Sequence, residues 1–206
     1  MELKEALIEL RKEKERKFKQ TVDLIVNLKG LDFRKTNISA IVPIPHKFKE
    51  RKICAFLNAK SDIVPTVTKP EFAKYASDKI MLKNLVKDYD FFIAHGPLMP
   101  AVATAFGKVL GPSGKMPSPQ LGIMMQDTPE EIKKTIISMS KSIKIRVKEG
   151  SVKIAVGKTD MKDEQIIENI QSIYQGLVSA LPTKRDNVRN VLVKFTMTKP
   201  IEVTVR

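Results

Sequence analysis

The stretch that decides the fold is Thr21–Leu28, whose sequence is TVDLIVNL. Every even-numbered position in it is Val or Leu, whereas the odd-numbered positions include Thr21, Asp23 and Asn27. A hydrophobic period of two predicts a β-strand with one buried face and one polar-leaning face. Gly30 then ends the run.

Two stretches near the other end of the chain share this pattern. Lys153 lies on the face opposite the apolar residues of Val152–Val156. Lys194 lies on the face opposite the apolar residues of Asn190–Met197. The intervening residues instead alternate expected helices with short buried strands, which is typical of an α/β unit. We therefore predict an α/β protein with two domains. An α+β sheet domain comes from both chain ends, residues 1–59 plus 142–206, and an inserted Rossmann-like α/β domain spans residues 60–141.

Two local predictions accompany this architecture. Residues 2–19 hold Leu3, Leu7 and Leu10 at helical spacing among many charges, which predicts a mostly exposed helix. The runs Ile143–Val147 and Val152–Val156 flank Glu149-Gly150, which predicts a β-hairpin.

The composition points to a polyanionic partner. The 206 residues include 37 Lys and Arg against 23 Asp and Glu, a net charge of +14, and 42% are hydrophobic. That hydrophobic fraction is enough for a core, so a disordered basic tail is excluded. Nucleic acid is the first candidate partner, because each cation near a phosphate releases condensed counterions. The alternative is a solvated basic surface without any partner.

The sequence offers little for catalysis or metal binding. Cys54 is the single cysteine, and only His46 and His95 accompany it, so neither a disulfide nor a metal site is expected. No catalytic nucleophile with a matching base stands out, so we expect neither an enzyme nor a cofactor. No apolar run is long enough to span a membrane and no secretory signal begins the chain, which predicts a soluble intracellular protein.

The glycine-rich stretch Gly107–Met116 fails as a phosphate-binding loop. Val109 stands where that motif needs glycine, and Met116 stands where it needs Ser or Thr for magnesium. Residues 111–114 also match the loose GXXG of KH domains, but the prolines at 117 and 119 block the helix that should follow. A rigid surface loop is the favoured interpretation.

Two short motifs are candidates for RNA contact. Lys17-Phe18-Lys19 places an aromatic ring between two cations ahead of a strand, which combines phosphate attraction with stacking. Its alternative is a helix end with a core phenylalanine. Thr196-Met197-Thr198 offers hydroxyls that could meet a ribose 2′-OH, although alone it is an ordinary approach to a β-turn.

Five stretches resemble, in order, the landmarks of the large-subunit ribosomal protein family called L one, in its archaeal-like version. They are Lys17–Asp23, Val42–His46, Gly111–Pro119, Ala155–Lys158 and Thr196–Met197. The most specific is the Gly-Pro-x-Gly-x-Met-Pro-x-Pro pattern at residues 111–119. The resemblance spans nearly the whole chain and implies two domains, as the strand alternation independently suggested.

The resemblance also implies a function. It implies a structural protein of the large ribosomal subunit that binds rRNA at a mobile stalk near the tRNA exit site. There it would assist release of deacylated tRNA, and it would also repress translation of its own mRNA. The implied partners are large-subunit rRNA, the mRNA operator, exit-site tRNA and other ribosomal components. The implied location is the ribosome in the cytoplasm, with no membrane partner and a monomer when free.

Candidate RNA-binding residues follow from the resemblance and from the polar strand faces. Carried over by position, the family's RNA-contacting surface maps to Lys17, Phe18, Thr21, Asp23, Thr196, Met197 and Thr198. The basic run and the polar strand faces add Lys19, Lys153, Lys158 and Lys194. Glycine is usual in the family at position 198 and glutamate at position 23. Because a β-branched residue does not easily take a positive φ, we expect the backbone near Thr198, or its approach to RNA, to differ.

Two other classes of function stay open on the sequence. One is a non-ribosomal RNA-binding or RNA-processing factor, which would need an active-site motif that the sequence does not show. The other is a basic scaffold for protein partners. Such a scaffold would purify without RNA, so the ratio of absorbance at 260 nm to that at 280 nm separates it from an RNA-binding protein.

Overall fold

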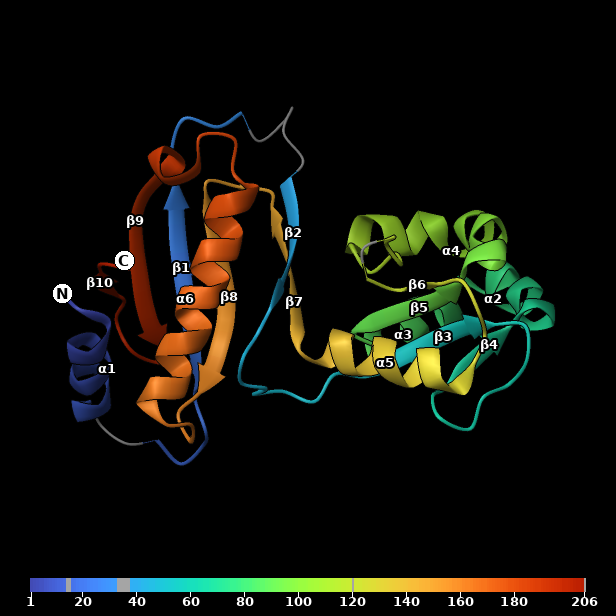
Figure 1. Ribbon diagram of the computed structural model, residues 1–206, viewed down its shortest axis with the longest axis horizontal. Helices are drawn as coiled ribbons and strands as arrows, with labels where there is room; N and C mark the ends of the chain where they lie inside the picture. The colour runs from blue at the N-terminus through green and yellow to red at the C-terminus, as the bar shows by residue number, and fades with distance from the viewer. Residues whose placement is uncertain (14–15, 33–37, 120, 206) are drawn as a thin grey trace. The chain divides into compact units, whose positions relative to one another are not determined.

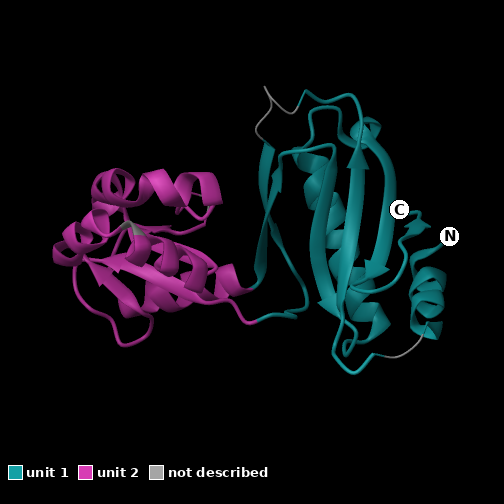
Figure 2. Ribbon diagram, turned by 180° about the vertical axis from the view of Figure 1, so that it is seen from behind, with its two compact units in different colours: residues 1–49, 141–206 teal, residues 50–140 magenta. Residues whose placement is uncertain are grey.

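The computed structural model describes residues 1–13, 16–32, 38–119 and 121–205 and is of the mixed α/β class, as predicted. The chain forms two compact units (Figure 2). Unit 1 comprises Met1–Lys49 and Lys141–Arg206, and unit 2 is the inserted segment Glu50–Ser140. The first crossing lies ten residues before the expected boundary at residues 59/60. The reason is that the strand Ile53–Leu57 pairs inside unit 2 and not with the strands of unit 1.

Unit 1 is built on a four-stranded antiparallel sheet in the order β10-β9-β1-β8. Its strands are β1 (Thr21–Leu28), β8 (Ser151–Lys158), β9 (Val188–Phe195) and β10 (Ile201–Val203). The helices α1 (Leu3–Lys12) and α6 (Asp163–Ala180) contact each other and pack on one face of this sheet (Figure 1). The even-numbered residues of β1 are buried against them, as the alternation predicted, while the odd-numbered residues are half-buried. We call the face opposite α6 the open face.

Helix α1 is shorter than expected. It ends at Lys12, and Glu13 is already extended, with φ −65° and ψ 156°. Leu3, Leu7 and Leu10 are buried. No apolar residue follows Leu10 at helical spacing before Phe18, so a longer helix would gain nothing from packing. Residues 14 and 15 of the predicted helix lie outside the described residues.

A separate two-stranded ribbon also belongs to unit 1. It consists of β2 (Ile38–Pro43) and β7 (Ser142–Val147), paired antiparallel. The predicted hairpin between residues 143–147 and 152–156 is therefore wrong. Although only three residues separate β7 from β8, β7 pairs with β2 and β8 pairs with β1. The 3₁₀ turn η3 (Lys184–Asn187) precedes β9.

Unit 2 is a three-layer Rossmann-like unit. Its parallel sheet has the order β4-β3-β5-β6, with β3 (Ile53–Leu57), β4 (Thr66–Thr68), β5 (Phe91–His95) and β6 (Ile123–Met124). One face packs on α2 (Phe72–Ser77), α3 (Lys79–Asp88) and α4 (Met99–Ser113), and the other on α5 (Pro129–Ser140). The short turns η1 (Lys69–Glu71) and η2 (Gly96–Leu98) precede α2 and α4. Every residue of β3 is buried, because both faces of this sheet are covered.

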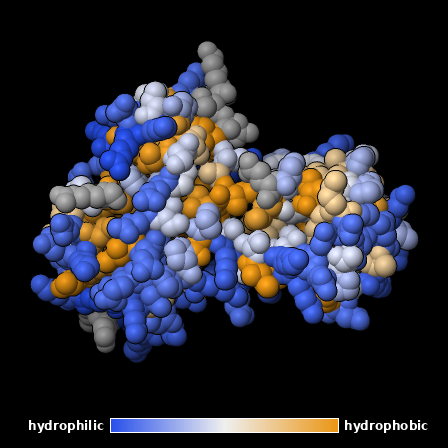
Figure 3. Space-filling model, in the orientation of Figure 1, coloured by the Kyte–Doolittle hydropathy of each residue, from blue (hydrophilic) through white to orange (hydrophobic). Residues whose placement is uncertain are grey.

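The glycine-rich stretch of unit 2 is not the loop that the sequence suggested. Helix α4 continues through Ser113 and ends at Gly114, whose φ of 75° is the left-handed conformation common after helices. Residues 111–113 are thus helical. Within the described residues, no helix is both long and apolar enough to cross a membrane. Hydrophilic side chains cover much of the face seen in Figure 3, with smaller hydrophobic patches between them.

Candidate nucleic-acid interface

The start of β1 and the ends of β8 and β9 lie next to one another at the same end of the unit 1 sheet. Because β1 runs antiparallel to both β8 and β9, its first residue Thr21 pairs with Lys158, and Val22 pairs with Phe195. The segments before β1, after β8 and after β9 therefore meet. We call these segments, residues 16–21, 158–160 and 195–199, the strand-end surface. It brings together Lys17, Phe18, Lys19, Thr21, Lys158, Thr196, Met197 and Thr198.

The remaining candidates lie on the open face. In the register of the sheet, Asp23 pairs with Lys194 and Ile25 pairs with Lys153. Since Asp23 and Ile25 are two residues apart on β1, both lysines project to the side away from α6. The strand alternation predicted this shared face. Lys17, in contrast, lies before the first residue of β1 and belongs to the strand-end surface.

Asp23 is the one acid among the candidates. Half-burial raises the pKa of its carboxyl above the ordinary value, and Lys194 across the strand partly offsets that rise. An ionised carboxylate accepts hydrogen bonds and repels phosphate. Asp23 is therefore suited to an N–H or O–H donor of a base or a ribose, while the lysines around it are suited to phosphates.

The hydroxyls after β9 are used within the protein. Thr196 Oγ1 accepts a hydrogen bond from the Thr21 backbone N–H at 3.0 Å, which ties the turn to the start of β1. Thr198 Oγ1 accepts from the Phe195 N–H at 2.9 Å, and the Thr198 N–H donates to the Phe195 carbonyl at 3.2 Å. Among described non-glycine residues, a positive φ occurs at Lys184. Thr198 therefore closes this turn without a positive φ. The expected difference in the approach to RNA stays a prediction.

Gln20 is a buried residue that the sequence reasoning missed. Its Oε1 accepts from the Met197 N–H at 3.1 Å, so it holds the turn after β9. Its backbone N–H donates to Thr159 Oγ1 at 3.1 Å, and the Thr159 N–H donates to its carbonyl at 3.0 Å. One side chain and its peptide thus join the three segments of the strand-end surface. No local sequence pattern signals this role, because the partners are more than a hundred residues away.

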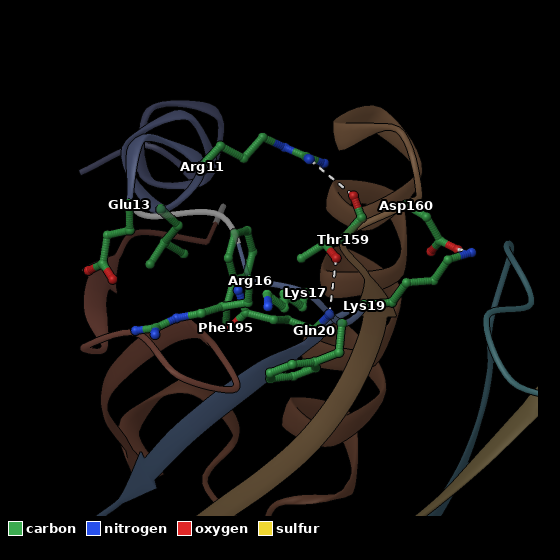
Figure 4. A pocket seen from close by; sticks show the side chains of 11 residues that line it. Arg11, Glu13, Arg16, Lys17, Lys19, Gln20, Thr159, Asp160 and Phe195 are labelled. Atoms are coloured by element: carbon green, nitrogen blue, oxygen red, sulfur yellow. Dashed lines mark hydrogen bonds and ion pairs between the residues drawn. The ribbon is translucent and has the colours of Figure 1, made fainter.

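A pocket of about 450 Å³ lies beside this junction (Figure 4). On one side, the Arg11 guanidinium forms an ion pair with Asp163 at 2.7 Å and donates to the Thr159 carbonyl at 3.0 Å. Figure 4 shows Thr159 between Arg11 and Gln20, hydrogen-bonded to both. The pocket is further lined by Leu10, Glu13, Arg16, Lys17, Phe18, Lys19, Asp160 and Phe195.

The cations of the pocket differ in what they are free to bind. Lys19 Nζ lies 2.8 Å from Asp160 Oδ2, and this hydrogen bond raises the pKa of Lys19. Arg16 and Lys17 are exposed and have no ion-pair partner within the described part of the chain. The sequence reasoning missed Arg16, although it directly precedes the Lys17-Phe18-Lys19 motif. Arg16 and Lys17 are the cations most available to an incoming phosphate.

Two apolar side chains on the strand-end surface face solvent. Phe18 is 53% exposed and Met197 is 56% exposed. The alternative of a core phenylalanine at position 18 is therefore wrong. An exposed aromatic ring between cations is the combination that nucleic-acid surfaces use to pair stacking with phosphate contact. Met197 is a flexible apolar side chain on a turn whose backbone is held by Gln20.

The lysine of the glycine-rich stretch serves the fold of unit 2. Lys115 Nζ donates to the backbone carbonyls of Val86 and Tyr89 at 2.5 and 2.6 Å, at the carboxyl end of α3. That position complements the negative end of the helix dipole and satisfies carbonyls that the helix leaves unpaired. A lysine held in this way does not reach a bound phosphate, which agrees with the failed phosphate-loop motif.

Comparison with known proteins decides the family. The model of the Ribosomal protein L1p/L10e family matches residues 10–199. The large ribosomal subunit protein uL1 of Pyrobaculum islandicum is 34% identical, over 99% of this chain and 94% of its own length. Those of Pyrobaculum calidifontis and Thermococcus kodakarensis are each 32% identical, over 94% and 92% of this chain and 89% and 90% of their own lengths. The chain belongs to the ribosomal L1p/L10e family.

Family membership confirms the resemblance drawn from the five motifs, including its archaeal version. The family consists of structural proteins of the large ribosomal subunit and not of enzymes. A location on the ribosome in the cytoplasm follows from that membership.

Proposed function

We propose that this protein binds large-subunit rRNA through the strand-end surface and the open face of unit 1. The observation that carries the proposal is the arrangement at the pocket of Figure 4. There Arg16 and Lys17 are unpaired among the described residues and directly precede the exposed Phe18. Phosphate attraction and stacking are thereby available at one place.

The charge distribution supports unit 1 as the rRNA-binding domain. Unit 1 holds 25 Lys and Arg against 14 Asp and Glu, a net charge of +11, whereas unit 2 holds 12 against 9, a net charge of +3. A polyanion is attracted to the unit with the larger positive excess, and its affinity falls with added salt as counterions compete.

The geometry gives the candidate residues different tasks in this proposal. The cations that contact phosphates are Arg16, Lys17, Lys153, Lys158 and Lys194. Phe18 stacks on an unpaired base, Met197 makes an apolar contact, and Asp23 accepts a hydrogen bond from a base or a ribose. Thr21, Thr196 and Thr198 hold the strand end in shape. Lys19 contributes once RNA competes with Asp160, since exposed ion pairs are weak.

We further propose the finer roles that the family resemblance implies. The bound rRNA is the mobile stalk beside the tRNA exit site, where the protein assists release of deacylated tRNA and contacts other ribosomal components. The free monomer also represses translation of its own mRNA by binding an operator through the same strand-end surface. Because one surface serves both RNAs, rRNA and the operator compete for it.

The test measures affinity for a large-subunit rRNA fragment that carries the stalk, at several salt concentrations. Replacing Lys17 with Ala should lower the magnitude of the slope of log affinity against log salt by about one. Lys108→Ala, which removes an exposed charge from α4 in unit 2, is the matched control and should leave the slope unchanged. Equal slopes for Lys17→Ala, Arg16→Ala and the control would remove the strand-end surface from the interface. Competition by the mRNA operator then tests repression separately.

A further inference from the structure

The β2–β7 ribbon has two faces of opposite character. In its register, Ser39 pairs with Arg146 and Ile41 pairs with Lys144, so these four side chains share one face. The opposite face carries Ile38, Ala40, Val42, Ile143, Ile145 and Val147 and joins the unit 1 core. Helix α6 packs against it closely, since a Cβ at Gly176 would clash with Val42. The face with the two cations, which we call the outer ribbon face, therefore points away from α6.

The outer ribbon face concentrates positive charge without compensation from its own strands. Neither ISAIVP of β2 nor SIKIRV of β7 contains an Asp or a Glu. Arg146 is half-buried, and its Nη1 is buried without a hydrogen-bond partner among the residues that the structure describes. Burial and the neighbouring Arg146 both lower the pKa of Lys144. A buried guanidinium N–H without a partner and a neighbouring cation are both unfavourable in the free protein. An anion that draws the guanidinium outward relieves both.

The spacing of the two cations fits an extended polyanion. Residues two apart on a strand lie roughly 7 Å from each other. Arg146 presents a planar fork that binds phosphate through two parallel hydrogen bonds, while Lys144 presents a point charge. Along the chain, β7 is followed by the exposed Lys148 and then by Lys153 of the open face. A single segment, residues 144–153, therefore supplies cations to the outer ribbon face and to the open face.

We propose that the outer ribbon face is a second phosphate-binding surface, on which Arg146 and Lys144 hold the backbone of the RNA bound by unit 1. This inference rests on the proposed function and extends it beyond the strand-end surface. Arg146 makes the stronger contact, because it has an unused donor. Lys144 adds charge at the neighbouring phosphate.

The test uses the full-length protein and the rRNA fragment, with Arg146→Met as the main variant. This change removes the charge and the fork while keeping an unbranched side chain of considerable length. RNA affinity should fall about tenfold or more, and the salt slope should shrink by about one. Lys108→Met is the matched control for loss of one charge in unit 2. Arg146→Lys, which keeps the charge but loses the fork, should give an intermediate affinity and an unchanged slope.

The melting temperature of the free protein separates recognition from a structural role. Since Arg146→Met removes a buried unpaired donor and a like-charge neighbour, it should raise that temperature while it weakens RNA binding. A lowered melting temperature with unchanged RNA affinity would overturn the inference, because Arg146 would then serve only the fold. A loss of affinity for poly-glutamate with no loss for RNA would also overturn it and would assign the face to an acidic peptide. If Lys17→Ala weakens RNA binding and Arg146→Met does not, the ribbon is excluded while the proposed function stands. A wild-type protein that does not bind the fragment contradicts both.

Discussion

The two units differ in how their sheets meet solvent. In unit 1 the helices α1 and α6 cover one face, so the open face displays Lys153, Lys194 and Asp23. In unit 2 helices cover both faces, and every residue of β3 is buried. An antiparallel sheet with a free face can place side chains for binding along its strands, whereas a sheet covered on both faces uses its strands only for the core.

Aromatic rings cluster in the core of unit 2, whereas unit 1 also exposes one. In unit 2, Phe56 stacks on Phe92 with ring centroids 5.5 Å apart and lies 4.8 Å from Phe106. In unit 1, Tyr174 and Phe195 are buried, but Phe18 is exposed on the strand-end surface. The buried rings contribute stability through contact area, and the exposed ring is available for recognition. The two units can therefore be perturbed independently, since each has its own core.

The largest expected effect concerns Cys54 in β3. This thiol is 1% exposed, and burial raises its pKa from 9.0 to about 12. Because the thiolate is the reactive form, a pKa higher by about three units lowers the thiolate fraction at pH 8 roughly a thousandfold. A thiol reagent should therefore label the native protein at least a thousandfold more slowly than the protein unfolded in guanidinium chloride. Comparable rates would mean that unit 2 opens readily.

The next effect concerns Phe106, which is fully buried among the aromatic rings of unit 2. Phe106→Ala should lower the free energy of unfolding of unit 2 by about 3–5 kcal/mol, because it loses buried area and leaves a cavity. Phe18→Ala is the matched control and should change stability by about 0.5 kcal/mol or less. Amide hydrogen exchange resolves the two units. Equal loss of protection in β1 of unit 1 would show that the cores are not independent.

Much of the fold was predictable because it depends on local periodicity. The alternation in Thr21–Leu28 gave the strand and its buried face correctly. The hairpin at residues 143–156 was wrong because strand pairing is non-local. The partner of β7 is β2, which lies about a hundred residues earlier and carries no pattern that specifies the pairing. The domain boundary was misplaced for the same reason, since β3 looks like any apolar strand until its partners are known.

The exposed residues of the candidate site were predictable from the sequence, but the residues that hold its segments together were not. Lys17 and Phe18 stand out because cations around an aromatic residue have a chemical meaning on their own. Gln20 and Arg11 act through partners distant in the sequence, so only the folded chain shows their roles. Thr198 illustrates the converse. Its replacement of the family's usual glycine predicted a local difference in the backbone, but the sequence did not predict that its hydroxyl accepts from the Phe195 N–H and closes the turn.

A smaller effect is expected at Thr196, whose hydroxyl accepts from the Thr21 N–H. Thr196→Val keeps the shape but removes this acceptor, at a cost of about 1 kcal/mol to the stability of unit 1. The melting temperature should fall by about 4 °C, while RNA affinity at low temperature should hardly change. Thr196→Ser, which keeps the hydroxyl, is the control and should retain most of the stability. A large loss of affinity without loss of stability would instead assign this hydroxyl to a direct RNA contact.

The smallest expected effect is on RNA affinity when the whole of unit 2 is deleted. Deleting residues 50–140 and joining Lys49 to Lys141 through a short glycine linker removes all of unit 2. Unit 1 should still fold, because its buried cluster, as far as the described residues go, contains no residue of unit 2. Since the cations and the exposed ring of the proposed interface all belong to unit 1, RNA affinity should stay within about threefold, roughly 0.6 kcal/mol, of the full-length value.

The shortened protein also provides its own control. Lys17→Ala made in it should still lower the magnitude of the salt slope by about one, as in the full chain, because the phosphate contact does not depend on unit 2. A folded product that loses most of its RNA affinity would place essential contacts in the inserted unit. In that case the free face of the unit 1 sheet would not be sufficient for binding. Unit 2 would have to contribute through its loops, since helices cover both faces of its sheet.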